Sequence, residues 1–393
     1  FLPALHSTLT AVHNSTARNA LHSANSVASM NAMKPITLYD VARHAGVSYQ
    51  TVSRVINQGA NVSPRTREKV MAAMTELQYI PNRGAQQLAG KRTRTVGLLT
   101  TDLALHAPSQ IAAAVKSRAG QVGVGVIISM LEQHDDAACT LALQELLAQR
   151  VEGLVINVPL DDERASMLAE LAHPVPALFL DVSPSATVNS LVFDAVQGAQ
   201  LGVTHLLEQG HQRIALLGGP SSSVSARARM AGWVSALESA GLSPCGCEFG
   251  DWSAASGYEK GHQLLAAGVQ PQAILVANDQ MALGAIRACT EKGLRVPGHI
   301  SIVGYDDTAD SAWYSPPLTT IRQAFRDAGE QSVDWLLAQQ SAKGEGEWQT
   351  RLPVTLVERA STSPENQADI SGENLARQLH ELAQMAAQLD RRN

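Results

Sequence analysis

The chain has 393 residues, of which 45% are hydrophobic, 4% aromatic and 17% charged. This length accommodates two or three ordinary domains. The sequence contains no run of eighteen apolar residues, so it predicts no membrane span. The formal net charge of −6 would by itself argue against binding to nucleic acid, but the charges are unevenly distributed along the chain.

The basic residues are concentrated near the N-terminus. Between Met33 and Arg94 there are ten basic residues and three acidic ones, so the rest of the chain has a large excess of acidic residues. A small basic segment joined to a large acidic body is typical of a protein whose head binds phosphate groups. The alternative is that these basic side chains only keep the segment soluble.

The first 32 residues and the cysteines give little information on function. Residues 1–32 lack acidic residues and the apolar core of a secretory signal. Their composition fits a mitochondrial-type address, but we interpret them as a disordered extension or upstream translation, since a start-like sequence begins at Met33. The cysteines form no C-x-x-C pair, which indicates a reduced cytoplasmic protein; they are Cys139, Cys245, Cys247 and Cys289.

Residues 36–79 predict three short helices. The first spans 38–45 and follows Thr37, a plausible N-cap. Gly46 supplies a sharp turn, and Ser48 caps a second helix over 49–57. The third starts at 64, behind Ser63 and with Pro64 in its first position. The apolar residues expected in the shared core are Leu38, Val41, Ala42, Ala45, Val52, Val55, Ile56, Val70, Ala73, Met74 and Leu77.

Two short helices around a glycine turn predict a helix-turn-helix, whose second helix enters the major groove of DNA. The residues expected to be exposed on that helix are Tyr49, Gln50, Ser53 and Arg54. Gln and Arg have forked side chains that read adenine and guanine. A generic three-helix packing module would not need so polar a face, so the segment predicts DNA binding.

Residues 81–92 form a polar segment with proline and glycine near its ends and one large apolar residue, Leu88. From its composition alone, this segment reads equally well as a flexible connector.

From Thr95 onward, continuous apolar runs alternate with helical stretches, which predicts parallel sheets buried on both faces. Eight such runs over this length suggest two doubly wound lobes rather than one sheet. The predicted strands span 96–99, 122–129, 153–157, 177–181, 190–193, 214–218, 273–278 and 300–306.

Four of these runs end in a carboxylate or an amide, and ligands of open α/β sheets bind at the carboxyl ends of strands. Short hydrogen-bonding groups that converge there suit a polyhydroxylated ligand. The alternative is that some of them only cap the next helix or turn. Trp252 could form an apolar wall for a sugar ring or lie in the core. The four residues are Asn157, Asp181, Asn278 and Asp306.

The C-terminal tail carries a short heptad seam. Two heptads are too few for a stable isolated helix, so self-association of several copies is implied. The seam residues are Leu375, Leu379, Leu382, Ala386 and Leu389.

The sequence contains none of the glycine-rich or nucleophile motifs of common enzymes. His380 and Glu381 begin like a metalloprotease motif, but Gln384 stands where the second histidine would be. We therefore expect no enzyme activity, no catalytic residue, no metal site and no cofactor.

Several motifs resemble known repressors. The run LYDVARHAGVSYQTVSRVIN at 38–57 resembles the headpiece of the LacI/GalR family. YIPNR followed by AQQLAGK, LALHAPSQI, SSVSARARMAGW, GDWSA, LVANDQMALGA and SIVGYDD are similar to the branch that controls lactose use rather than to purine, ribose or galactose relatives. The resemblance runs from Met33 essentially to the end of the chain.

The resemblance implies an all-α helix-turn-helix headpiece, an α/β two-lobed periplasmic-binding-protein-like core with parallel doubly wound sheets, and a C-terminal leucine-heptad helix. The implied domains are a headpiece at 33–81, a hinge helix at 82–94, the core at 95–360, a linker at 361–374 and a tetramerisation helix at 375–393. Within the core, lobe N covers about 95–193 and 325–352, and lobe C covers about 194–321 and 353–360.

The function implied by the resemblance is sequence-specific repression of a lactose-utilisation operon in the bacterial cytoplasm. Homodimers that assemble into a tetramer would bind a pseudo-palindromic double-stranded DNA operator, and a galactoside inducer such as allolactose would release them. Leu88 of the hinge would wedge into the minor groove. The implied DNA-binding residues are Thr37, Leu38, Ser48, Tyr49, Gln50, Thr51, Ser53, Arg54, Asn57, Asn61, Ser63, Thr66, Tyr79, Asn82, Ala85, Gln86 and Leu88.

The resemblance also implies an inducer pocket in the core. Its residues are Leu105, Ala107, Pro108, Ile111, Asn157, Leu180, Asp181, Phe193, Ser225, Arg229, Trp252, Asn278, Asp306, Gln323 and Phe325.

Two residues depart from the family pattern. Gly84 stands where the hinge usually has valine, and glycine costs a helix roughly 0.5–1 kcal/mol relative to alanine. Ala386 shortens one position of the heptad seam.

Three other functions compete with this one. A sugar-transport binding protein would carry a secretory signal and no helix-turn-helix, and an NAD enzyme would need a glycine fingerprint. A repressor that answers another sugar or a nucleotide would differ only in its pocket.

Overall fold

The computed structural model describes residues 36–56, 62–81, 93–131, 135–266, 268, 270–341, 348–364 and 380. The chain divides into two compact units, Phe1–Lys91 and Arg92–Asn393. We refer to the described parts of these units as the headpiece and the core. The predicted residues Asn57, Asn61, Asn82, Ala85, Gln86 and Leu88, the whole heptad seam, Gly84 and residues 1–32 lie outside the described residues.

The headpiece consists of the three predicted helices, α2 (Leu38–Ala45), α3 (Tyr49–Ile56) and α4 (Pro64–Glu76). Their apolar faces meet in one small core around the buried residues Val41, Ala42, Val52, Val55, Val70 and Ala73. The partly buried residues packed against this core include Leu38, Ala45, Ile56, Met74 and Leu77. The helical spacing of apolar residues therefore predicted the headpiece packing correctly.

The predicted starts of the three headpiece helices are confirmed by the local hydrogen bonds. The backbone N–H and the hydroxyl of Thr37 donate to Asp40 at 2.9 and 2.7 Å. Gly46 has a φ of 65°, which a side chain would disfavour, and it turns the chain from α2 toward α3. The Ser48 and Ser63 hydroxyls each accept a backbone N–H at 3.2 Å, at the starts of α3 and α4.

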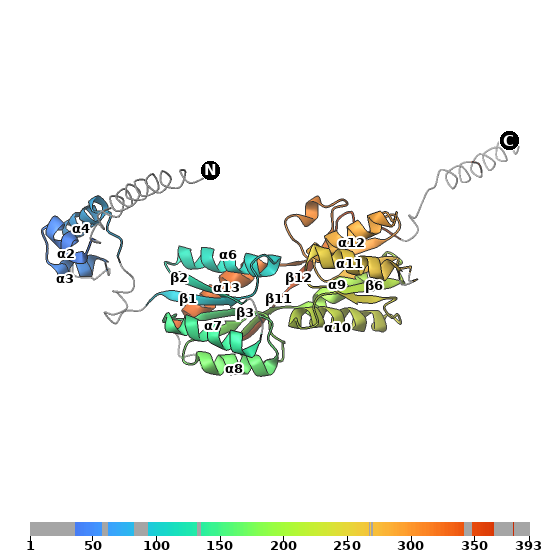
Figure 1. Cartoon of the computed structure of the whole chain (residues 1–393), viewed down its shortest axis with the longest axis horizontal. Coiled ribbons are helices and arrows are strands. Elements are labelled where there is room, and N and C mark those ends of the chain that lie inside the picture. Colours follow the sequence, from blue (N-terminus) through green and yellow to red (C-terminus); the bar gives the residue numbers. More distant parts are fainter. Residues whose placement is uncertain are drawn as a thin grey trace, which may run out of the picture. The chain divides into compact units, whose positions relative to one another are not determined.

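The first lobe of the core, lobe N, is built on a six-stranded sheet of order β11-β5-β4-β3-β1-β2, whose paired strands are all parallel. Helices α6 and α13 cover one face, and α7 and α8 cover the other (Figure 1). The strands are β1 (Thr95–Thr100), β2 (Gly125–Met130), β3 (Leu154–Asn157), β4 (Ala177–Phe179), β5 (Ser190–Phe193) and β11 (Gln349–Leu352). The helices are α6 (His106–Gln121), α7 (Asp136–Ala148), α8 (Asp162–Ala172) and α13 (Phe325–Ser341).

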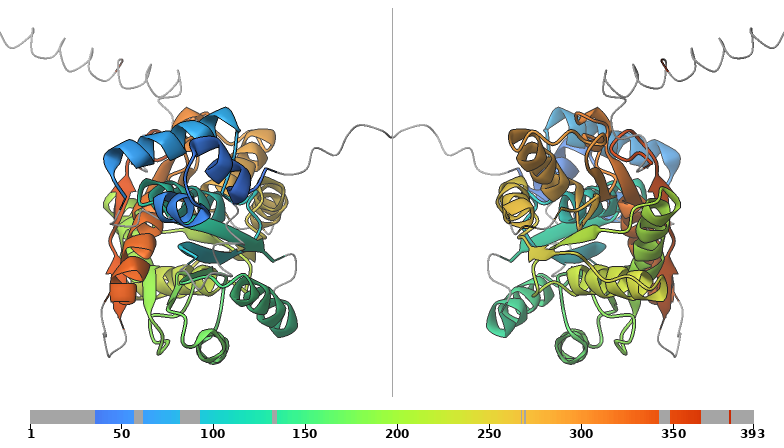
Figure 2. Two further views of the ribbon diagram at one scale, coloured as in Figure 1. Left: turned by 90° about the vertical axis from the view of Figure 1, so that its left-hand side faces the viewer. Right: turned by 90° about the vertical axis from the view of Figure 1, so that its right-hand side faces the viewer.

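The second lobe, lobe C, has a six-stranded sheet of order β12-β10-β9-β8-β6-β7, in which only β12 is antiparallel to its neighbour. Helices α9 and α10 cover one face, and α11 and α12 cover the other (Figures 1 and 2). The strands are β6 (Ile214–Gly218), β7 (Cys247–Phe249), β8 (Ala273–Val276), β9 (Ser301–Asp306), β10 (Thr319–Gln323) and β12 (Val354–Val357). The helices are α9 (Ala195–Glu208), α10 (Val224–Ser239), α11 (Ala254–Ala266) and α12 (Asp279–Glu291).

Twelve strands occur among the described residues, so the prediction of eight was incomplete. The missed strands are β7, β10, β11 and β12, three of which lie at the edge of a sheet and carry exposed or polar residues. The predicted strand at 122–129 was placed too early. Val122 is the C-cap of α6, and Gly123 turns the chain with a φ of 71°, so β2 begins only at Gly125.

The chain passes between the lobes three times within the described residues. It goes from β5 to α9 at 193–195, from β10 to α13 at 323–325, and from β11 to β12 at 352–354. Such repeated crossings give the two lobes a shared hinge.

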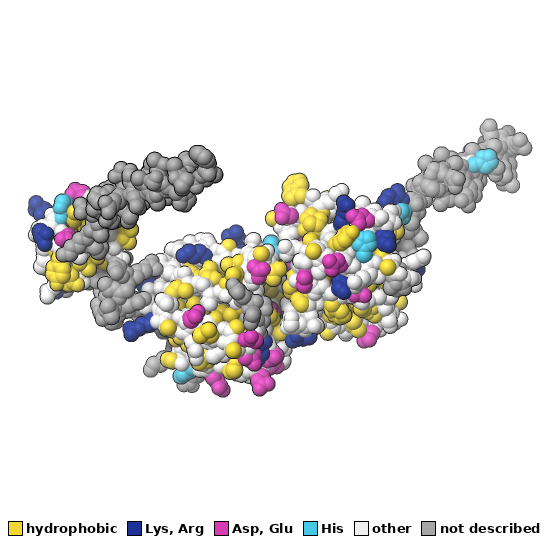
Figure 3. Space-filling view, viewed as in Figure 1, with side chains coloured by type: hydrophobic (Ala, Val, Ile, Leu, Met, Phe, Trp, Pro, Cys, Tyr) yellow, Lys and Arg dark blue, Asp and Glu magenta, His cyan; other side chains and the backbone are white. Residues whose placement is uncertain are grey.

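The surface of lobe N shows the acidic character predicted for the body. Acidic side chains gather over α7 and α8 (Figure 3), where Asp135, Asp136, Asp161, Asp162 and Glu163 are exposed. Within the described part of the chain, no helix is both long and apolar enough to cross a membrane. The same residues contain no group of three His, Cys, Asp or Glu placed to hold a metal ion.

Candidate functional site

The second headpiece helix, α3, presents a polar face to solvent. Tyr49, Gln50 and Arg54 are exposed, while Thr51 and Ser53 are half-buried beside the core residues Val52 and Val55. The exposed face therefore carries the side-chain types that read base edges in the major groove.

A pair of aromatic rings adds an apolar element to this face. Tyr39 of α2 is 65% exposed and Tyr49 is 41% exposed, and their rings stack with centroids 4.7 Å apart. The two stacked tyrosines are exposed, so their hydroxyls are available for contacts with phosphate or bases.

The remaining DNA-binding candidates in the described residues fall into two groups. Thr37, Ser48 and Ser63 are exposed at the starts of helices, where backbone N–H groups also suit phosphate; Thr66 is half-buried beside Ser63. Leu38 and Tyr79, by contrast, pack against the headpiece core, so their first role is structural.

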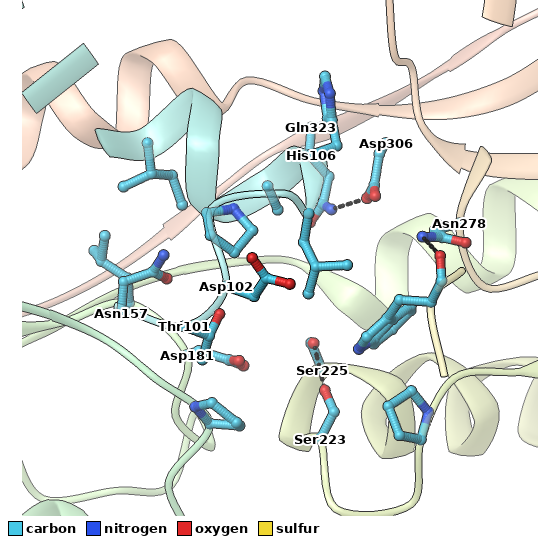
Figure 4. Close-up of a pocket in the computed structure, with 18 of the residues that line it drawn as sticks. Thr101, Asp102, His106, Asn157, Asp181, Ser223, Ser225, Asn278, Asp306 and Gln323 are labelled. Carbon is cyan, nitrogen blue, oxygen red and sulfur yellow. Dashed lines mark hydrogen bonds between the residues drawn. The ribbon is translucent and has the colours of Figure 1, made fainter. Parts of the chain in front are cut away.

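The core contains a cavity of about 360 Å³ between the lobes, and all fifteen predicted inducer-pocket residues line it. Figure 4 shows Asn157 and Asp181 on one side of this pocket and Asn278 and Asp306 on the other. The size is in the range of small-molecule sites. Whether these residues bind a sugar stays a prediction, but the structure does bring all of them together.

Lobe N contributes two of the predicted polar residues. The Asn157 amide donates to the Thr100 hydroxyl at 3.4 Å. Asp181 keeps some contact with solvent in the pocket, yet it lies deep enough between the lobes for burial to raise its pKa to about 6, against the opposing charge of Arg229. Both side chains retain hydrogen-bonding capacity for a ligand.

Lobe C contributes an arginine held by several groups. The Arg229 guanidinium is 4.0 Å from the centroid of the Tyr305 ring and 5.4 Å from that of Trp252. It donates to the Ala277 carbonyl and lies 3.4 Å from Asp306. Burial raises the pKa of Asp306, which the charge of Arg229 opposes. Arg229 is therefore both a pocket residue and an ion-pair partner within lobe C.

Two more predicted residues, Asn278 and Trp252, make structural contacts in the pocket. Asn278 caps α12 by accepting the Met281 backbone N–H at 2.9 Å, as the capping alternative proposed. Its amide also donates to the Trp252 carbonyl at 3.0 Å (Figure 4). A Cβ at Gly219 would collide with the Trp252 ring at 2.5 Å, so the indole lies flat against the backbone as a wall.

The opposite wall is aromatic. The Phe325 ring packs edge-on against Phe193 and His106, with centroids 5.3 and 5.7 Å apart. Apolar walls combined with a few fixed polar groups are what a sugar-binding site requires, because a sugar ring has apolar faces and polar edges.

The sequence reasoning missed ten residues that also line the pocket. Thr101, Asp102, Pro159 and Pro220 lie within two residues of the ends of β1, β3 and β6, so a wider form of the rule used for the four Asx residues finds them. Arg164 on α8 gave no such signal. The ten are Thr101, Asp102, His106, Pro159, Arg164, Pro220, Ser222, Ser223, Asp251 and Gln280.

Asp279, between the pocket residues Asn278 and Gln280, is a buried carboxylate that predicts a pH-dependent stability of the core. Asp279 is fully buried and accepts hydrogen bonds from the Thr320 hydroxyl at 2.6 Å and the Thr308 backbone N–H at 2.8 Å. Burial raises the pKa of Asp279 to about 7, although the hydrogen bond from Thr320 opposes this shift. The site is tight, because a Cβ at Gly304 would collide with the carboxylate.

We expect the core to become less stable as the pH rises from about 4 to about 7. Over this range the folded protein keeps a proton on Asp279 that the unfolded chain has released, with a slope of up to about 1.4 kcal/mol per pH unit. Asp279→Asn should make the slope shallower when urea unfolding of the full chain is followed at several pH values. Glu248→Gln removes the ion pair between Glu248 of β7 and Lys260 of α11, and it should keep the parental slope. A parental slope in Asp279→Asn would contradict the assignment.

The architecture defines a class of protein in which a helix-turn-helix unit and a two-lobed α/β core with an interlobe pocket share one chain. Residues 37–82 match the bacterial regulatory proteins of the lacI family, and residues 203–362 match the periplasmic binding protein-like domain. The chain belongs to the LacI family, and the predicted fold class is confirmed for the headpiece and the core.

Its similarity to lactose operon repressors covers most of the chain. The repressor of Escherichia coli strain K12 is 56% identical over 359 residues, which cover 91% of this chain and 99% of that protein. The repressor of Klebsiella pneumoniae is 44% identical over 340 residues, which cover 86% and 96%. A crystal structure of the lac repressor dimer bound to operator and the anti-inducer ONPF has a TM-score of 0.80 at 58% identity, covering 84% of this chain and 100% of that one.

Proposed function

We propose that this protein is a sequence-specific repressor of a lactose-utilisation operon, and that a galactoside such as allolactose releases it from its operator. The observation that carries the proposal is the presence, in one chain, of an exposed polar recognition helix and an interlobe pocket with aromatic walls and converging polar groups. The first binds DNA sequence-specifically, and the second changes the protein's state when it is filled.

The similar proteins support the galactoside over other inducers. The two relatives described above are both lactose operon repressors, whereas the purine and ribose repressors that also match are 33–35% identical. A lac repressor structure bound to ONPG in the repressed state has a TM-score of 0.79. A repressor that answers a different sugar or a nucleotide is the main competing function.

Operator gel shifts test the proposal directly. We expect the full chain to shift a lac-type operator, and isopropyl thiogalactoside to release it, while glucosides, ribose and purines leave the complex intact. Release by ribose or a purine, with no response to galactosides, would favour the competing function. Failure to shift any operator-like duplex would contradict repression itself.

The assembly of the chain is part of the proposal. Homodimers would match the two halves of a pseudo-palindromic operator, and the heptad residues from Leu375 to Leu389 would join two dimers into a tetramer. Truncation after Gly372 should leave dimers that bind one operator but cannot hold two in a loop. Sedimentation of the full and truncated chains measures the number of subunits in each assembly, and the same number for both would refute the role of the seam.

Release from the operator requires only the binding of the inducer. The inducer binds one arrangement of the lobes more tightly than the other, and this difference lowers operator affinity without any covalent step. We propose that the protein acts in the bacterial cytoplasm and that release needs no cofactor and no catalysis.

A further inference from the structure

Asp307 follows the pocket residue Asp306 directly, but its carboxylate is bound by other groups. One oxygen accepts from Arg322 Nε at 2.6 Å, and the other accepts from Arg359 Nη2 at 2.6 Å. Asp307 does not line the pocket, whereas Asp306 does. Of these two successive acidic residues, Asp306 therefore lines the pocket and Asp307 binds two arginines outside it.

The ion pair of Asp307 with Arg359 is shielded from solvent, whereas Arg322, in the other ion pair, is 54% exposed. The Asp307 side chain is only 9% exposed, and that of Arg359 is 18% exposed. Arg359 is itself held, because it also donates to the Leu318 carbonyl at 2.8 Å. Burial raises the pKa of Asp307, but the hydrogen bonds from Arg359 and Arg322 outweigh this and leave the pKa below its ordinary value. The carboxylate is thus charged and firmly anchored at neutral pH.

The backbone at this point needs an anchor. Asp306 has a φ of 107° and Asp307 a φ of 54°, both in the region that side chains disfavour. Consecutive non-glycine residues in this region persist only where the surrounding structure holds them, and such strain gathers at ligand sites. The ion pairs of Asp307 act at the second of these two residues, directly beside Asp306, whose carboxylate Arg229 and Gln323 also bind.

The same ion pairs act on a second pocket residue. Arg322 lies opposite Asp306 in the register of β9 and β10, and the next residue is Gln323. The Gln323 amide donates to Asp306 at 2.7 Å inside the pocket (Figure 4). Gln323 also begins the crossing to lobe N, where Phe325 opens α13. Arg322 therefore connects Asp307 to Asp306 through the strand register and to Gln323 through the chain.

We propose that Asp307 is a positioning residue for the inducer, which holds Asp306 and Gln323 in their binding geometry through Arg322 and Arg359. The inference rests on the proposed function, since it takes the pocket to be the galactoside site. Asp307 touches no ligand and acts only on the shape of the lobe C side of the pocket.

The test compares the full-length parent with Asp307→Asn, because asparagine has nearly the same shape and tolerates a positive φ but cannot form the ion pairs. We expect isopropyl thiogalactoside, titrated by tryptophan fluorescence, to bind about tenfold more weakly to the variant. Operator affinity without sugar should stay within about twofold. Arg322→Met should lose part of the sugar affinity. If Asp307→Asn does not fold, parental sugar affinity in Arg322→Met would overturn the inference.

A matched control separates positioning from general stability. Glu248→Gln breaks the ion pair with Lys260 on β7, at the opposite edge of the sheet from β12, and should keep the parental sugar affinity. Parental affinity in Asp307→Asn, or an equal loss in Glu248→Gln, would overturn the inference.

Amide hydrogen exchange of the ligand-free protein keeps this inference distinct from the proposed function. Exchange over 305–308 and 322–325 should become faster in Asp307→Asn and stay parental in Glu248→Gln. If the parent binds no galactoside, the proposed function is wrong, and exchange alone then decides on Asp307. Unchanged exchange in Asp307→Asn would overturn its positioning role.

Discussion

Arg229→Leu should bind operator like the parent and fail to release it when a galactoside is added. The guanidinium lines the pocket and offers forked donors that can bridge neighbouring sugar hydroxyls. Loss of a hydrogen bond to a charged group costs about 1.5–3 kcal/mol, and the leucine also leaves Asp306 without its cation, so we expect sugar affinity to fall about 100-fold or more. Operator affinity with and without isopropyl thiogalactoside measures the effect.

The structure makes a control necessary, because Arg229 also supports lobe C. It pairs with Asp306, donates to Ala277 and covers the Tyr305 ring, so Arg229→Leu should lower the melting temperature as well. Arg229→Lys keeps the charge and loses the fork, so it should retain more stability than affinity. Arg227→Leu makes the same chemical change at an exposed position two residues earlier on α10 and should respond to sugar normally. Release of Arg229→Leu at the parental sugar concentration would exclude Arg229 as an inducer ligand.

The sequence predicted the parts of the fold that are apolar throughout. Runs such as 214–218 are buried on both faces of a sheet, and their composition alone identifies such strands. Strand β10 was missed because its Thr-Thr-Ile-Arg-Gln composition is polar. Its threonines are nevertheless buried, since the Thr320 hydroxyl and the Thr319 backbone N–H are satisfied by Asp279 and Ser361. Those partners are distant in sequence, so no local pattern reveals them.

The residues of the candidate site could likewise be predicted only in part from the sequence. The rule that ligands bind at the carboxyl ends of strands identified four pocket residues from the sequence alone, namely Asn157, Asp181, Asn278 and Asp306. The sequence also suggested Trp252 as an apolar wall. The other predicted pocket residues came from the resemblance to the family. Nothing local marked Arg229, which stands on a helix and reaches the pocket only after lobe C has folded. The strained φ of Asp306 and the anchor at Asp307 were equally invisible, because both depend on the contact between β9 and β10.

Arg54→Ala should weaken operator binding by about 1–3 kcal/mol if the guanidinium makes a bidentate contact with a base, and Gln50→Ala should have an effect of similar size. Both side chains are exposed on α3, whose opposite face is fixed by Val52 and Val55, so neither substitution should disturb the headpiece core. Binding to random DNA depends on phosphate contacts and should fall much less. Competition between operator and random duplexes at fixed salt measures the difference.

Arg43→Ala is the matched control for Arg54→Ala, because it removes the same charge from the same unit. Arg43 lies in the last turn of α2, with its side chain 81% exposed beside Asp40. Its loss should lower affinity for operator and random DNA alike, since it changes only the general attraction to phosphate. If Arg54→Ala and Arg43→Ala lowered both affinities to the same extent, α3 would contribute charge and no sequence reading.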